Sequence, residues 1–254
     1  AFVKQAGTYY VYANVTDTGN PASGVASVTA NVSALTPGQT AAPLVAGSFT
    51  VGGVAYNRRS ASLTVQNPLA PGGLTYSVTT ADVAGNTQTT SGLGVTVDNT
   101  APAAADVQTA NVGSLVATAQ LSDTITFTTG EPLDPESILA GWTGASANVV
   151  VRINNVGGSD TLQVFNSTNT TQLNLGTVTL GSTAYVTANR TFGLTGTPST
   201  MVRSGNTITV TLGTASGAVT TAPANGTMSW APSTAAYDRA GNAIERRVGG
   251  DKYE

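Results

Sequence analysis

The sequence contains no cysteine and no histidine. Without cysteine the chain cannot form a disulfide, a thiolate metal site or a thiol nucleophile. Without histidine it has neither a serine–histidine–aspartate triad nor an imidazole metal ligand. Because these absences remove the commonest catalytic side chains, the sequence predicts a protein that is not an enzyme and requires no cofactor.

Charge is also scarce, at 9% of the 254 residues, with a formal net charge of −3. The ten lysines and arginines are scattered, so no basic stripe of the kind that binds nucleic acid is present. No apolar run approaches the ~20 residues of a membrane-spanning helix. The chain begins with Ala1 rather than methionine, so we expect that processing or truncation removed a preceding segment.

Threonine and serine take the place of charged residues, with 43 and 20 copies, and glycine adds 29. Threonine, valine and isoleucine favour the pleated surface of strands, whereas glycine and asparagine supply turns. The abundance of β-branched residues argues against disorder, although the low charge alone does not. The composition therefore predicts a folded all-β protein.

Short alternating segments separated by turn residues recur along the first hundred residues. About seven of them precede residue 98, at the ~8–12-residue spacing typical of a β-sandwich. Tyr76 begins the sixth of them, where it is either a tyrosine corner or an ordinary half-buried strand residue.

The second half of the chain is longer than a minimal sandwich. Residues 123–129 alternate as a strand and lead into a loop in which Pro135 favours the first position of a single helical turn. Residues 181–206 have little strand character, and we expect them to form an excursion over one face.

The pattern D-x-A-G-N occurs twice, at residues 82–86 and 238–242. Each copy follows a strand-like run, and the first precedes a closing strand and a joint that contains Pro102. With these motifs, residues 8–102 resemble the bacterial immunoglobulin-like repeats of surface adhesins. Residues 123–244 resemble the immunoglobulin-like domains of S-layer and related cell-wall proteins, and the threonine-rich style is similar to exported proteins of actinobacteria. The matching residues are Val15-Thr16-Asp17, Ser23-Gly24-Val25-Ala26-Ser27-Val28, Tyr76, Asp82-Val83-Ala84-Gly85-Asn86, Val97-Asp98-Asn99-Thr100-Ala101-Pro102, Ile125-Thr126-Phe127, Glu131-Pro132-Leu133-Asp134-Pro135 and Asp238-Arg239-Ala240-Gly241-Asn242.

This resemblance implies two tandem immunoglobulin-like β-sandwich domains, at residues 1–98 and 103–254, joined by a linker at 99–102. The second domain would be enlarged by loop excursions and would end in a short tail. The implied function is a non-enzymatic structural or display module, a stalk or fibre component, of an extracellular bacterial surface protein. Its partners would be neighbouring immunoglobulin-like domains of the same or identical chains.

Two alternatives to this function remain open. One is a carbohydrate- or protein-binding adhesin domain that contacts a surface glycan or protein. The other is a filament subunit that donates its N-terminal strand to a neighbour. For the first alternative, Trp142, Trp230, Tyr185 and Phe192 would form a sugar-stacking platform if exposed, but large rings usually fill the core.

The carboxylates suggest one metal site. In a sandwich, the loops 130–136 and 238–242 would lie at the end nearest the joint that carries Asp98. Oxygen ligands gathered in this way are what calcium prefers, and the predicted ligands are Asp98, Asp238, Glu131 and Asp134. The alternative is that Asp82 and Asp238 only cap tight turns. A glycoside-hydrolase pair of Glu131 and Asp134 is disfavoured, because aromatics are only 6% of the chain.

Overall fold

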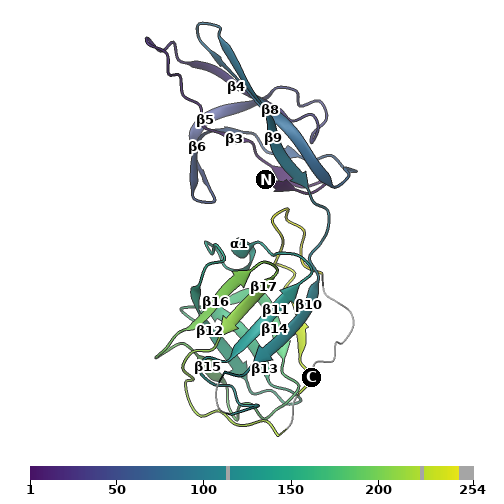
Figure 1. Cartoon of the computed structure of the whole chain (residues 1–254), viewed down its shortest axis with the longest axis vertical. Coiled ribbons are helices and arrows are strands. Elements are labelled where there is room, and N and C mark those ends of the chain that lie inside the picture. Colours follow the sequence, from purple (N-terminus) through teal and green to yellow (C-terminus); the bar gives the residue numbers. More distant parts are fainter. Residues whose placement is uncertain (113–114, 224–225, 246–254) are drawn as a thin grey trace. The chain divides into compact units, whose positions relative to one another are not determined.

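The computed structural model describes residues 1–112, 115–223 and 226–245, and strands dominate throughout (Figure 1). The chain splits into two compact units, Ala1–Thr100 and Ala101–Glu254, which we call unit 1 and unit 2. The split falls inside the segment 99–102 that the sequence analysis treated as a linker. Over the described ranges the single helix is α1 (Pro135–Ile138), and no helix there is long and apolar enough to cross a membrane.

Unit 1 contains nine strands, seven of which form one sheet in the order β1-β9-β8-β4-β5-β6-β3, while β2 and β7 pair separately. Neighbours in the sheet are antiparallel except β1 and β9, which are parallel. The strands are β1 (Phe2–Val3), β2 (Thr8–Tyr9), β3 (Tyr12–Ala13), β4 (Val25–Asn31), β5 (Ala42–Val51), β6 (Val54–Ser60), β7 (Leu63–Thr64), β8 (Gly72–Asp82) and β9 (Thr87–Val97).

The sheet of unit 1 curls into a half-barrel. Register shifts interrupt the β4–β8, β5–β6 and β8–β9 pairings, and such bulges bend a strand and increase its twist. Two small apolar clusters fill the unit. One surrounds Val28, Ala30 and Leu44, and the other surrounds Leu35 and Val65.

Unit 2 is a nearly closed eight-stranded antiparallel barrel in the order β10-β11-β17-β16-β12-β13-β14-β18. The end strands β10 and β18 approach each other, and the short strand β15 pairs with β12 outside this order. The strands are β10 (Ala104–Ala110), β11 (Thr124–Thr129), β12 (Ala147–Asn154), β13 (Thr161–Asn166), β14 (Gln172–Thr179), β15 (Arg190–Phe192), β16 (Ser199–Ser204), β17 (Thr207–Thr211) and β18 (Ser229–Ala231).

Alternation along the strands of unit 2 produces the barrel interior. In β11, Ile125 and Phe127 are buried, while the intervening threonines are half-exposed. Phe192 and Met201 are fully buried in the same core. An eight-stranded barrel has an interior just wide enough to be filled by side chains or to hold one small ligand.

The prediction of two immunoglobulin-like sandwiches is wrong, although the all-β class is confirmed. A sandwich distributes its strands over two facing sheets, whereas here seven strands of unit 1 continue as one sheet and eight of unit 2 close on themselves. Strand spacing and turn residues are the same in both architectures, because the difference lies in which strands pair.

Two local predictions have opposite outcomes. The helical turn at Pro135 is confirmed as α1, which begins at that proline. The excursion predicted at residues 181–206 is wrong, because this segment contains β15 and β16, and β16 lies between β12 and β17 inside the sheet.

Candidate functional site

The two D-x-A-G-N segments are closed loops held by their aspartates. In unit 2, the Asn242 backbone amide donates to one oxygen of Asp238 at 2.8 Å and its side-chain amide donates to the other at 2.9 Å. The Ala240 amide also donates to Asp238 at 2.8 Å. The residues on either side of the loop, Tyr237 and Ala243, form an antiparallel bridge.

The loop in unit 1 has the same geometry. Asn86 donates its backbone and side-chain amides to the two oxygens of Asp82, both at 2.7 Å. The flanking residues Ala81 and Thr87 are paired in the β8–β9 ladder. The side-chain hydrogen bond from Asn86 is the largest cause that lowers the pKa of Asp82. Both aspartates therefore cap turns, as the simpler of the two interpretations expects.

The structure places the four predicted metal ligands in three different settings. Glu131 and Asp238 come together in unit 2, with carboxylate oxygens within 4.8 Å of each other. Asp134 is instead the N-cap of α1, where it accepts the Glu136 amide at 3.1 Å. Asp98 follows β9 in unit 1 and accepts the Thr100 amide at 3.0 Å. Calcium binding stays a prediction.

The aromatic residues predicted as a sugar platform are mostly in the core of unit 2. Phe192 and Trp142 are buried, and the Trp142 indole donates to the Ala145 carbonyl. Trp230 packs edge-on against Phe127 and donates to the Leu175 carbonyl at 2.6 Å. Because their rings fill the barrel, these residues do not form an exposed platform.

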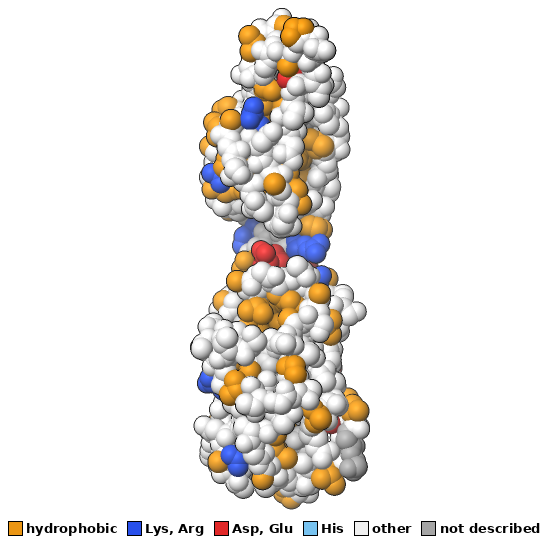
Figure 2. All heavy atoms as spheres, turned by 90° about the vertical axis from the view of Figure 1, so that its left-hand side faces the viewer, with side chains coloured by type: hydrophobic (Ala, Val, Ile, Leu, Met, Phe, Trp, Pro, Cys, Tyr) orange, Lys and Arg blue, Asp and Glu red, His pale blue; other side chains and the backbone are white. Residues whose placement is uncertain are grey.

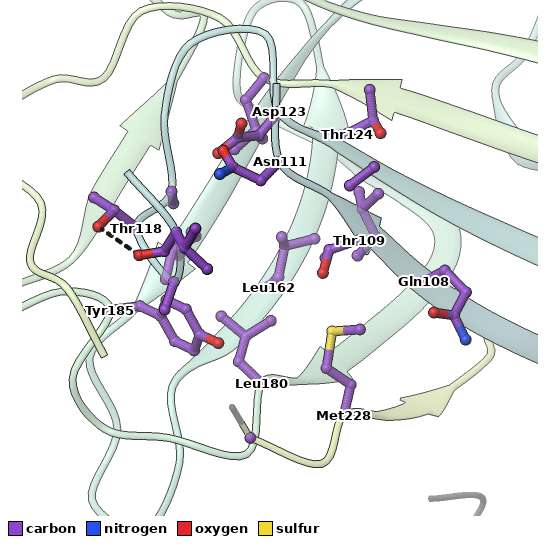
Figure 3. A pocket seen from close by; sticks show the side chains of 18 residues that line it. Gln108, Thr109, Asn111, Thr118, Asp123, Thr124, Leu162, Leu180, Tyr185 and Met228 are labelled. Atoms are coloured by element: carbon purple, nitrogen blue, oxygen red, sulfur yellow. Dashed lines mark hydrogen bonds between the residues drawn. The ribbon is translucent and has the colours of Figure 1, made fainter. Parts of the chain in front are cut away.

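One end of the barrel contains a cavity of about 280 Å³ (Figure 3). Its lining comes from the last residues of β10 and β12, the first residues of β11 and β13, and the residues that directly follow β14 and β17. Antiparallel neighbours bring these alternating termini to the same end of the barrel. The apolar wall includes Ile125, Ile153, Leu162, Leu180, Leu212 and Met228. The cavity is therefore the unfilled end of the barrel core.

The polar part of the cavity lining comes from Gln108, Thr109, Asn111, Thr118, Asp123, Thr124 and Tyr185. Tyr185 points into it, and burial, followed by the nearby Asp160 charge, raises the pKa of its phenol (Figure 3). The Tyr185 hydroxyl makes no hydrogen bond within the described ranges. Asp123 accepts the amides of Val112 and Gln120 at 2.9 and 2.8 Å, and the described part of the lining includes no lysine or arginine. Such a cavity suits a neutral, largely apolar molecule that carries a hydrogen-bonding group at one end or more.

Unit 1 carries a second group of interest, which sequence reasoning missed. Tyr10, Tyr12, Phe49 and Tyr56 form a chain of ring contacts with centroids 5.4–6.2 Å apart, and Arg59 lies against two of the rings. We call these five residues the Arg59 cluster. The alternation of residues 9–12 contained the signal, because Tyr10 and Tyr12 share the strand face opposite the buried Val11.

No protein family, curated protein or solved structure matches this chain.

Proposed function

We propose that this chain is a non-enzymatic structural and display module of an extracellular bacterial surface protein. The observation that carries the proposal is the repeated loop: two separately packed β-units in one chain use the same aspartate–asparagine closure. Repetition of one structural device along a chain is typical of proteins that extend by adding units. The uncharged, threonine-rich composition supports the same role.

The proposal is tested on intact cells of the source bacterium. Cells are treated with a protease that does not enter them, and the chain is then followed with an antibody against unit 2. Loss of the signal from unlysed cells, with a cytoplasmic marker preserved, is the expected result. Protection of the chain until lysis would overturn the proposal.

One observation argues against the alternative in which the chain donates its N-terminal strand to a neighbour. The first strand, β1, pairs with β9 of its own unit, Phe2 beside Thr96 and Val3 beside Val97. A filament would require this pairing to be replaced by one between chains. Filaments that appear with increasing concentration in negative stain would favour that alternative over a passive spacer.

A second candidate function is favoured by the barrel cavity: binding of a small neutral molecule in unit 2. Several exposed apolar side chains lie in the segment next to the cavity, among them Val112, Leu115, Val116 and Leu121. Val116 also lines the cavity, so apolar surface continues from outside to inside. Contiguous exposed apolar patches often mark binding surfaces.

Calorimetric titration with 1-octanol and with octanoate tests this candidate. Octanol is expected to bind more tightly, because none of the described residues that line the cavity is a cation that could pair with a carboxylate. Tyr185→Phe is expected to weaken octanol binding by roughly two- to tenfold, as expected for one lost neutral hydrogen bond. Met228→Trp fills the cavity and abolishes binding, whereas Val202→Trp, at an exposed position of β16, leaves it unchanged. Equal affinity for octanoate, or undiminished binding by Met228→Trp, would exclude the cavity as the site.

A further inference from the structure

Arg59 projects from the solvent-facing side of the unit 1 sheet. In the strand pairing, Arg59 lies opposite Tyr12 of β3 on one side and opposite Val45 of β5 on the other. Directly opposed residues share a face, and Val45 is 60% exposed. The neighbours Leu44 and Ser60 are buried and belong to the other face. Side chains on the Arg59 face are therefore presented to solvent.

Two aromatic rings hold the Arg59 guanidinium. Its central carbon lies 4.9 Å from the Tyr10 ring centroid and 4.4 Å from that of Phe49. The Phe49 ring in turn covers Gly47, where a Cβ atom would lie only 2.5 Å from the ring. Figure 2 views unit 1 from the side of β5 and β6, where hydrophobic side chains gather around basic ones. The cation is thus positioned before any ligand arrives.

The hydrogen-bonding capacity of this group is unused. The Arg59 Nε is buried without a hydrogen-bond partner, and within the described ranges neither terminal nitrogen makes a hydrogen bond or an ion pair. The hydroxyls of Tyr10, Tyr12 and Tyr56 likewise make no hydrogen bond there. By contrast, the adjacent Arg58 donates to the Asn57 carbonyl at 3.0 Å. The Arg59 cluster therefore combines a planar cation, the exposed Tyr10 ring, three half-buried rings and three hydroxyls without a described hydrogen bond.

We propose that the Arg59 cluster is a binding site for an acidic sugar, a hexuronate residue of a polysaccharide. The terminal nitrogens of Arg59 would pair with the sugar carboxylate, because a guanidinium donates to a carboxylate through two parallel N–H groups. The electron-rich ring faces would take the polarised C–H groups of the sugar ring. The tyrosine hydroxyls would bond the sugar hydroxyls.

An acidic sugar fits the site better than an acidic peptide. A peptide that adds to a sheet uses the open backbone of an edge strand, and β3, the edge here, has only two residues. Beyond β3, Asn14 donates its side-chain amide to the Ala55 carbonyl and Asn57 donates to the Val15 carbonyl, so residues 14 and 15 join β6 through side chains and do not extend the edge strand. The groups that the Arg59 cluster offers to a ligand are a cation, aromatic rings and hydroxyls, all of them on side chains. These groups suit a polyhydroxylated acid.

Binding is measured on the whole chain by calorimetric titration with three probes: tetragalacturonate, a neutral galactose tetrasaccharide and tetraglutamate. Tetragalacturonate is expected to bind, the neutral sugar more weakly and tetraglutamate most weakly. Arg59→Gln is expected to lower the affinity for tetragalacturonate by about ten- to a hundredfold, the size of one lost charge-assisted interaction. Arg59→Lys is expected to recover little, because it keeps the charge but not the planar fork.

Arg58→Gln is the matched control, since it removes the same charge one residue away and should change the affinity less than about twofold. Tyr10→Ala removes an exposed ring without touching the core and should weaken both sugars, so the proposal remains testable if an Arg59 variant misfolds. An equal loss of affinity for tetragalacturonate in Arg58→Gln would show that the effect of Arg59 comes from net charge alone. Preferred binding of tetraglutamate would identify the ligand as a peptide. Absence of tetragalacturonate binding would overturn the site, while the display role would stand.

Discussion

Asn242 satisfies both carboxylate oxygens of Asp238, one with its backbone amide and one with its side chain. Asp238 is 3% exposed, so these hydrogen bonds replace those that water would make. The aspartate in turn receives the Ala240 amide. The aspartate that the sequence pattern suggested as a metal ligand thus also caps the turn of its own loop.

Asp238→Ala is expected to destabilise unit 2 by about 2–4 kcal/mol, because it leaves the Ala240 and Asn242 amides without their acceptor in a buried loop. Urea unfolding followed by tryptophan fluorescence measures this, since both tryptophans, Trp142 and Trp230, lie in unit 2. Asp82→Ala is the matched control, and its unfolding is followed by far-ultraviolet circular dichroism, because Asp82 lies in unit 1 and both tryptophans lie in unit 2. It should have a smaller effect because water replaces the carboxylate in an exposed loop. A greater loss from Asp82→Ala would contradict this ranking.

Gly176→Ala is expected to destabilise unit 2 by more than ~3 kcal/mol. Gly176 has φ +83°, and an added Cβ would lie 2.1 Å from the Ala231 carbonyl oxygen of β18. The methyl group would therefore push away the strand that closes the barrel. Gly205→Ala is the control: its φ of +58° is as unfavourable for alanine, but nothing lies within 4 Å, so only about 1–2 kcal/mol is expected. Equal midpoints of urea unfolding for the two variants would show that the close approach is relieved cheaply.

The sequence predicted the all-β class and α1, because both depend on neighbouring residues. β-branched alternation determines strands, and Pro135 after Asp134 determines where the helical turn begins. Which strands pair with one another, by contrast, depends on residues that are far apart in the sequence. Nothing local indicates that β1 adds to β9 or that β16, at residues 199–204, inserts between β12 and β17. The sandwich prediction was wrong at that level.

The same dependence on strand pairing explains why only part of the candidate sites could be predicted from the sequence. Glu131 and Asp238 were chosen for their place in loops, and the structure does bring their carboxylates together. The Arg59 cluster was missed because it joins residues 10–12, 49 and 56–59, which become neighbours only when β3, β5 and β6 pair. For Trp142 and Phe192 the sequence leaves open an exposed platform or a place in the core, and the structure places both in the core.

Acid is expected to destabilise unit 1 through Asp17 and Asp82. The Gly19 and Gly24 amides lower the pKa of Asp17, and Asn86 lowers that of Asp82, each from an ordinary value of 3.8. Because the folded pKa lies below the unfolded one, the stabilisation is complete above about pH 5 and is lost as pH falls through the folded pKa. Melting followed by far-ultraviolet circular dichroism between pH 7 and pH 2 measures it. The double variant Asp17→Asn/Asp82→Asn should show a flatter dependence, and an unchanged pH profile would contradict the contribution.

Calcium is expected to raise the melting temperature if Glu131 and Asp238, the two predicted ligands that lie together in unit 2, hold it. A ligand that binds only the folded state stabilises it by about 2.7 kcal/mol when its free concentration is about a hundred times Kd. Melting is compared in calcium and in chelator, so each variant serves as its own reference for folding. Glu131→Ala should lose the calcium-dependent shift, whereas Asp82→Ala, which alters the same kind of loop in unit 1, should keep it. Identical midpoints in calcium and chelator for the unmodified chain would leave Asp238 with loop closure as its role, because its two oxygens already accept Asn242.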